Sequence, residues 1–252
     1  MVVSRRRVRP VLSVAAFALA ASVGVPTTAA ASDVREDKGS FSVFLGGVRI
    51  GVLGFSGLTD GQNYAAKGIL RTTGLAAMVR QVGYEATSRG VVRGGRLVPT
   101  SYDEAANTGT RVSKSTMEYR GGVPQVKASS PERAPRPTDV DPRTQAGTVD
   151  PMTAFYLVLR DVPEAELCNL DLKMFDGTRR SQVTISAPVR NGAGVSCTGE
   201  YRRLQGFSAE EMAERTRFPF QIAYIPNGNG GYRLNEITTA STFGNARVVR
   251  TD

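Results

Sequence analysis

The sequence predicts a mainly β protein: a curled antiparallel sheet of about twelve strands, a half-barrel or β-spiral, wrapped around one buried helix, plus a second short helix. Three observations lead to this fold class. From residue 41 onward, apolar and polar side chains alternate with the period of half-buried strands. Gly-Gly and Asp-Gly turns separate these stretches. Residues 148–161 instead have helical periodicity and are apolar on nearly every side, which is typical of an enclosed helix.

Residues 1–31 have the pattern of a cleaved secretory signal peptide. Four arginines between residues 5 and 9 precede an apolar run at 11–25, and small residues at 29–31 offer a cleavage site before Ser32. The run is about fifteen residues long, short of the roughly 20 that span a bilayer. We therefore expect export to the periplasm of a Gram-negative bacterium and no integral membrane segment after cleavage. A loose leader at 32–40 and a single β-rich domain at 41–252 would follow.

The net charge of the whole chain is +9, and the four arginines of the N-terminal segment account for +4 of it, which leaves +5. These charges are scattered rather than clustered. Such a pattern predicts an ordinary solvated surface and no nucleic-acid partner, and it leaves the oligomeric state open.

The alternation predicts a run of antiparallel hairpins before the helix. The expected strands cover residues 41–45, 48–58, 63–71, 83–92, 97–105, 111–119 and 123–128. Residues 73–81 fit either a short helix or crossing loop, or simply the edge of a strand. Residues 129–147 hold four prolines and no apolar period, so we expect an exposed connection there, either a functional flap or a spacer.

The central helix is delimited by its own residues. Asp150 stands at the N-cap position and Pro151 at the first helical position. One face of the helix is apolar at positions i, i+3, i+4 and i+7; it is formed by Met152, Phe155, Tyr156 and Leu159. These four side chains either face a ligand or fill the core. Asp150 and Arg160 either contact a ligand's polar group or satisfy the two helix ends.

After the helix, strands are expected at residues 167–175, 179–187, 195–203, 218–225, 232–241 and 244–250. Asp176-Gly177 marks a hairpin turn. Ser208 and Glu211 form a capping-box pattern that begins the second helix, which we expect to end near Arg217.

The two cysteines, Cys168 and Cys197, predict a disulfide, because two lone thiols in an oxidising compartment usually pair. The bond poses a geometric problem. In a flat meander the first and third strands lie about 9–10 Å apart, too far for a disulfide. Either the sheet curls or Cys168 lies in the loop before its strand.

No catalytic, cofactor or metal site is predicted. The chain has no histidine, which removes the usual base of serine and cysteine hydrolases and the commonest metal ligand. No phosphate loop, dinucleotide fingerprint or Ser-x-x-Lys motif is present. Carboxylate pairs such as Asp139 with Asp141 and Glu210 with Glu211 lie in the proline-rich loop and in the first turn of a helix, which account for them. An enzyme that uses carboxylates on envelope glycans is kept as a third hypothesis.

Three segments together resemble the bacterial family called domain of unknown function 3108: 41–51, 149–160 and 175–179. The resemblance implies an exported envelope protein of curled antiparallel β-structure and supplies no catalytic residues. The fold also resembles, more weakly, the periplasmic lipoprotein carriers and β-spiral envelope-integrity proteins.

These observations predict a non-enzymatic protein that binds a lipid, an acyl chain or another hydrophobic envelope component inside the curled sheet. The alternative is a module for protein interaction or envelope integrity whose core the helix fills.

Overall fold

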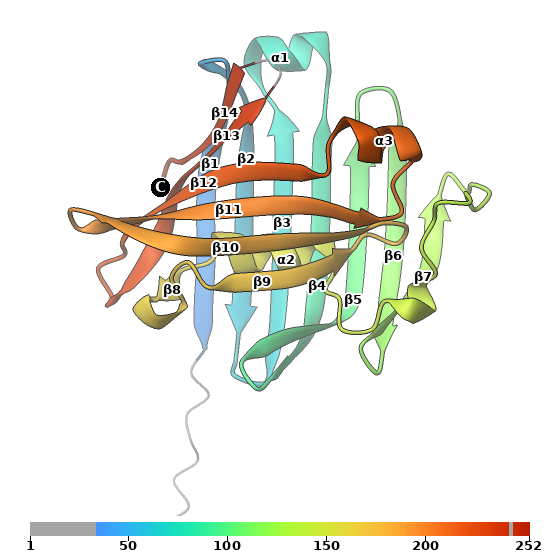
Figure 1. Ribbon diagram of the computed structural model, residues 1–252, viewed down its shortest axis with the longest axis horizontal. Helices are drawn as coiled ribbons and strands as arrows, with labels where there is room; N and C mark the ends of the chain where they lie inside the picture. The colour runs from blue at the N-terminus through green and yellow to red at the C-terminus, as the bar shows by residue number, and fades with distance from the viewer. Residues whose placement is uncertain (1–33, 242–243) are drawn as a thin grey trace, which may run out of the picture. The chain divides into compact units, whose positions relative to one another are not determined.

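The computed structural model describes residues 34–241 and 244–252 (Figure 1). The expected signal peptide lies outside the described residues. Within them, one antiparallel sheet holds fourteen strands. The strands are β1 Arg35–Leu45, β2 Val48–Thr59, β3 Asn63–Thr72, β4 Gly83–Arg93, β5 Arg96–Asn107, β6 Val112–Arg120, β7 Val123–Ser130, β8 Val162–Pro163, β9 Leu170–Phe175, β10 Arg180–Asn191, β11 Gly194–Gln205, β12 Arg217–Pro226, β13 Gly231–Ser241 and β14 Gly244–Arg250.

The sheet is assembled from two series of hairpins. β1 to β7 pair in sequence order, and so do β9 to β14. The two series are joined where β14 pairs with β1, from Phe41 opposite Arg250 to Leu45 opposite Ala246. β7 and β9 are the two free edges, so the sheet is curled but not closed, as predicted. The short strand β8 lies off this path and pairs with β13.

Helix α2, Pro151–Leu159, lies inside the curl, between the layer of β2–β5 and strand β9 (Figure 1). Asp150 caps it as predicted: the carboxylate accepts a hydrogen bond from the Thr153 backbone N–H at 2.8 Å. Glycines on the inner face of the sheet let the helix approach. A Cβ at Gly57 would lie 2.2 Å from the Tyr156 ring. The prediction of a buried helix is therefore confirmed.

The expected loose leader at 32–40 is wrong from Arg35 onward, because β1 begins there and pairs with β2 along its whole length. The inward-facing residues of this part of β1 are Asp37 and Gly39, neither of them apolar. Asp37 is buried because the Tyr156 hydroxyl donates a hydrogen bond to it at 2.7 Å. The strand pattern is thus invisible in the sequence, since its inward face is polar.

The proline-rich connection is largely exposed, as expected, but it is more structured than a simple loop. Its first residues, 129 and 130, belong to β7, and a 3-10 helix, Pro142–Thr144, forms near its end. The Val140 N–H donates to the Thr178 carbonyl at the β9–β10 turn, and the Gly147 N–H donates to the Gly122 carbonyl at the β6–β7 turn. The end of the connection is therefore fastened to both free edges of the sheet.

Two short helices lie outside the curl. Residues 73–81, left open by the sequence, form helix α1, Gly74–Val79. Helix α3, Ala209–Glu214, begins with the predicted capping box of Ser208 and Glu211 and ends before the expected boundary at Arg217, where β12 already begins. A second 3-10 helix, Glu164–Glu166, follows β8.

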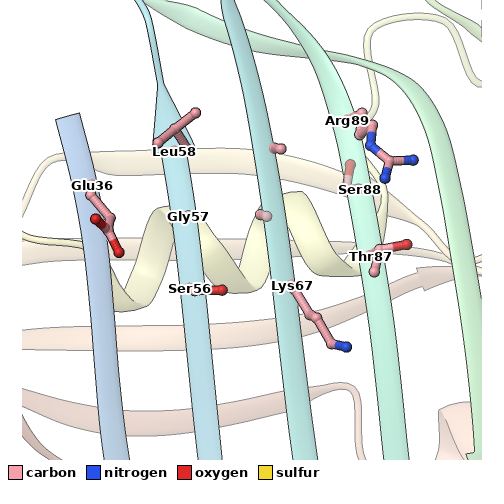
Figure 2. Close-up of a pocket in the computed structure, with 10 residues that line it drawn as sticks. Glu36, Ser56, Gly57, Leu58, Lys67, Thr87, Ser88 and Arg89 are labelled. Atoms are coloured by element: carbon pink, nitrogen blue, oxygen red, sulfur yellow. The ribbon is translucent and has the colours of Figure 1, made fainter. Parts of the chain in front are cut away.

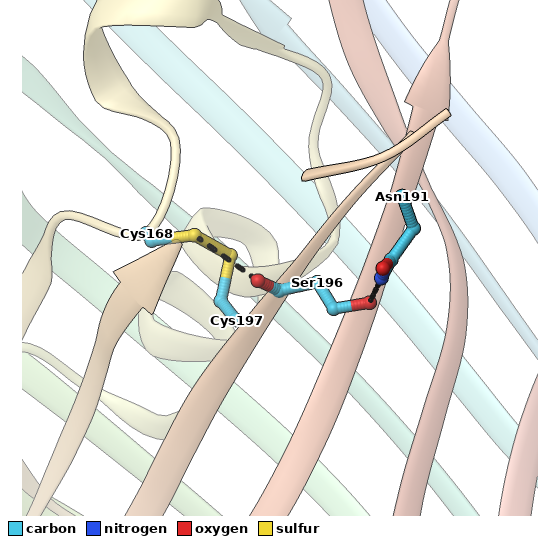
Figure 3. The surroundings of a disulfide bond; sticks show 4 residues. All are labelled: Cys168, Asn191, Ser196 and Cys197. Carbon is cyan, nitrogen blue, oxygen red and sulfur yellow. Dashed lines mark hydrogen bonds between the residues drawn. A yellow bond between two sulfur atoms is a disulfide. The ribbon is translucent and has the colours of Figure 1, made fainter. Parts of the chain in front are cut away.

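The predicted disulfide joins Cys168 to Cys197, with a Cα–Cα distance of 5.4 Å (Figure 3). Cys168 lies in the loop that precedes β9 and not in the strand itself, which is the second of the two arrangements that would allow the bond. Beside the bond, the Asn191 side-chain amide donates to the Ser196 hydroxyl at 2.8 Å, across the β10–β11 hairpin (Figure 3). Among the described residues, no helix is both long and apolar enough to cross a bilayer.

Candidate functional site

An apolar pocket of about 320 Å³ lies between α2 and the strands β2–β5. It is lined by Leu53, Gly68, Ile69, Leu70, Tyr84, Ala86, Tyr102, Glu104, Pro151, Met152 and Phe155. The lining is almost entirely hydrocarbon. This is the place where the curled sheet and its helix leave room for a small apolar group.

Small side chains on neighbouring strands create this space. Gly68 of β3 lies directly opposite Ala86 of β4, and Ala86 lies opposite Glu104 of β5. A Cβ at Gly68 would come within 2.9 Å of the Met152 sulfur, so the absence of a side chain there sets the distance between helix and sheet. Phe155, only half-buried, forms part of the helical wall.

Glu104 is the one ionisable acid among the described residues that line the pocket. The buried Tyr102 hydroxyl donates a hydrogen bond to its carboxylate at 2.6 Å. Burial, with a further contribution from Glu104, raises the pKa of Tyr102, so the hydroxyl remains a donor at every physiological pH. Burial also raises the pKa of Tyr84, which is partly exposed at the mouth of the pocket. Tyr84 therefore stays neutral, because its phenolate would be a second negative charge close to the Glu104 carboxylate.

A buried polar network holds the N-terminal end of the helical wall. The Asp150 side chain is fully buried and accepts hydrogen bonds from the Thr153 hydroxyl at 2.6 Å and the Ser88 hydroxyl at 2.8 Å. The Tyr64 hydroxyl lies 2.7 Å from that of Thr153. Because the two smaller hydroxyls direct their protons at the carboxylate, Tyr64 is the donor to Thr153. Burial raises the pKa of Asp150 to about 6, against the lowering effect of these donors.

A second network holds the C-terminal end of α2. Besides the Tyr156 hydroxyl, Asp37 accepts a hydrogen bond from the Asp161 backbone N–H at 3.2 Å and forms an ion pair with Arg35 at 3.1 Å. Arg160 pairs with Glu166 at 2.5 Å. The helical wall is therefore fastened at both ends by groups on other elements.

Of the six helix residues that the sequence singled out, the structure places only some beside the pocket. Met152 and Phe155 line the pocket, whereas Tyr156 and Leu159 are buried elsewhere in the core. Asp150 caps the start of α2 with its side chain, whereas the Arg160 side chain pairs with Glu166 and only its backbone N–H bonds the helix, at the Tyr156 carbonyl; neither residue lines the pocket. Sequence reasoning missed Gly68, Ala86 and Glu104. The sequence held one indication of this pocket: Gly68 and Ala86 are small residues at inward-facing positions of neighbouring strands.

A second depression, of about 290 Å³, lies over the outer face of β1–β4, with α2 behind the sheet (Figure 2). Its charged side chains are Glu36, Lys67 and Arg89, and Lys67 already pairs with Glu85 at 2.7 Å. Across the part of the chain that the structure describes, no group of three His, Cys, Asp or Glu residues is placed to hold a metal ion. For an apolar ligand the pocket beside α2 is the better candidate site, because its lining is almost entirely apolar, whereas the second depression carries three charged side chains.

The chain belongs to the family described as "Protein of unknown function (DUF3108)", whose model matches residues 40–202. No curated protein matches the chain. Among solved structures, it is similar to a beta-barrel-like protein of domain of unknown function DUF1849 from Brucella abortus. The identity is 10%, the TM-score is 0.47, and the match covers 86% of this chain and 96% of that one.

Proposed function

We propose that this protein is exported to the periplasm, where it binds the acyl chain of a lipid, or a similar hydrophobic envelope component, without catalysing a reaction. The observation that carries the proposal is the apolar pocket between α2 and β2–β5. Its volume of about 320 Å³ falls at the lower end of the range of small-molecule sites, roughly 300–1,000 Å³.

The chemistry of the lining favours a hydrocarbon tail over a charged ligand. Leu53, Leu70, Met152 and Phe155 offer only apolar atoms, and burying apolar surface against them is the available source of binding energy. Glu104 would repel an anionic head group held beside it. The tail would therefore enter the pocket and the head group would stay at the mouth.

Two features support export. The N-terminal residues have the composition of a signal peptide. The disulfide between Cys168 and Cys197 is of the kind that persists in oxidising compartments. The absence of histidine from the chain supports a binding role rather than a hydrolytic one.

One observation favours the second candidate, a protein-interaction or envelope-integrity module with a filled core. Met152, Tyr156 and Leu159 are each at most 3% exposed, so the helix itself occupies much of the interior. In that case the pocket is a remnant of imperfect packing and holds no ligand.

Native mass spectrometry of the chain from Ser32 to Asp252, purified from a periplasm without detergent, tests the proposal. A defined extra mass that extracts into organic solvent as lipid is expected. A bare mass, together with no binding of a fluorescent fatty-acid probe, would contradict the proposal and favour the filled-core module.

A pair of matched variants locates the site. Ala86→Phe places a ring in the pocket, whereas Ala105→Phe places the same ring on the outer face of the neighbouring strand. We expect the first variant to lose the bound mass and to weaken probe binding at least tenfold, and the second to bind like the wild type. Equal binding by both variants would place the ligand elsewhere.

A further inference from the structure

Half of the ten large apolar residues that the described chain exposes gather at one end of the sheet, the end that carries α1 (Figure 1). The β1–β2 turn, α1 and the β5–β6 turn all lie at this end, as the strand registers require. We call these five side chains the apolar rim: Val48, Leu75, Met78, Val79 and Val112.

The exposure of the apolar rim is extreme on α1. Leu75, Met78 and Val79 are 75%, 82% and 89% exposed, the highest values of any large apolar residue in the described chain. α1 has no buried residue at all, so packing within this chain does not explain its apolar composition. Leu75, Met78 and Val79 are spaced i, i+3 and i+4 and therefore share one face of α1, and an exposed apolar face of this kind marks an interaction site.

Cations surround the apolar rim. Five exposed basic side chains lie at the same end, and none of them is in an ion pair within the described residues: Arg49, Arg71, Arg80, Arg111 and Lys114. Of the nearby acids, Glu85 is neutralised by Lys67 at 2.7 Å and Glu104 turns toward the pocket. Glu132 is exposed two residues beyond Ser130, which lies opposite Lys114, so the five cations still outnumber the free acids here. The charge of this end is therefore complementary to an anionic surface.

The apolar rim is continuous with the pocket beside α2. Leu70 and Tyr84, which face each other across β3 and β4, line the pocket. The next pair toward α1, Arg71 and Gly83, already belongs to the rim end. Tyr84 is 39% exposed and also lines a depression of about 210 Å³ that extends to Val112 of the apolar rim.

We propose that this end of the protein docks on the surface of an anionic lipid bilayer, with Leu75, Met78 and Val79 inserted among the head groups and the surrounding cations held against lipid phosphates. Apolar side chains flanked by basic ones are the arrangement that binds at such an interface. The docking rests on the rim itself. Its use to pass an acyl chain between bilayer and pocket rests on the function proposed above.

Flotation of the purified chain 32–252 with vesicles tests the docking. We expect binding to vesicles of phosphatidylcholine mixed with phosphatidylglycerol, weaker binding to phosphatidylcholine alone, and a loss of binding at high salt. Leu75→Ser, Met78→Ser and Val79→Ser together should lower the affinity for the mixed vesicles at least tenfold. Each basic residue changed to Gln should lower it about fivefold.

A matched triple variant, Val34→Ser, Leu58→Ser and Val189→Ser, removes three exposed apolar side chains elsewhere and should float like the wild type. Unchanged flotation of the α1 variant, or no flotation of the wild type, would overturn the proposal. Loss of binding in the basic variants alone would mean that the protein adsorbs to the vesicles by charge without inserting α1, and would overturn the proposal equally. Ala86→Phe should float normally, so failure of the pocket is distinguishable from failure of the docking.

Discussion

At the scale of single residues, Asp150 combines two requirements that usually conflict. It caps α2 with its carboxylate, and it is fully buried next to Ser88 and Thr153. Capping favours the charged form, whereas burial disfavours it. Burial has the larger effect and raises the pKa from 3.8 to about 6.

The first prediction concerns this carboxyl. The pKa of Asp150 is higher in the folded state than in the unfolded state, so between about pH 4 and pH 6 the native state binds more protons. The contribution of Asp150 to stability therefore falls as the pH rises through this range. The loss amounts to about 3 kcal/mol. Asp150→Asn keeps a capping oxygen and removes the titration. Urea unfolding at pH 4 and pH 7 should show the wild type losing stability relative to this variant, and parallel pH profiles would contradict the prediction.

The second prediction concerns the contact between sheet and helix. Gly57→Ala would place a Cβ 2.2 Å from the Tyr156 ring, so we expect destabilisation of about 1–3 kcal/mol in urea unfolding. Gly54→Ala is the matched control in the same strand, because its Cβ would meet nothing closer than 3.6 Å. Similar unfolding midpoints for the two variants would show that the helix has room to withdraw.

At the scale of elements, β1 is longer than its apolar residues indicate. Residues 35–40 pair with β2, and Asp37 holds the Tyr156 hydroxyl. A chain that starts at Phe41 should therefore melt at a lower temperature than one that starts at Ser32, because the buried Tyr156 hydroxyl loses its acceptor at a cost of about 1–3 kcal/mol. Thermal unfolding by circular dichroism checks this. Equal melting temperatures would mean that residues 35–40 are dispensable, as a loose leader would be.

The disulfide acts on another element, the loop that leads into the edge strand β9. Cys168 and Cys197 are separated by 29 residues, and a loop of this length contributes roughly 3–4 kcal/mol in the chain-entropy model. Replacing both cysteines with Ser should lower stability by this amount. Reductant should destabilise the wild type equally and leave the double variant unchanged. An effect of reductant on the double variant would point to another cause.

At the scale of the whole described domain, two hairpin series depend on each other. They meet where β1 pairs with β14, and α2 contacts both β2–β5 and β9. We expect a single cooperative unfolding transition, in which tyrosine near-ultraviolet and backbone far-ultraviolet circular dichroism change together. Two separated transitions would show that each series folds on its own.

Local patterns in the sequence determined a large part of this protein. Asp150 and Pro151 fix the start of α2 through capping chemistry, and Ser208 with Glu211 does the same for α3. Alternation locates the strands because every second side chain faces the core. The two cysteines could pair only with each other. All of these depend on residues close in the sequence or on composition.

Tertiary structure alone decided the rest. Asp37 faces inward because the hydroxyl of Tyr156, 119 residues away in the sequence, donates a hydrogen bond to it. Glu104 faces inward on the same side of β5 as its donor Tyr102, two residues before it, but only the folded structure shows that this side lines a pocket. The pocket exists because Gly68 and Ala86 come into register opposite each other. Register and the approach of α2 are set by packing between distant segments, so the division of the helix into pocket-lining and core residues could be seen only once the sheet had curled around it.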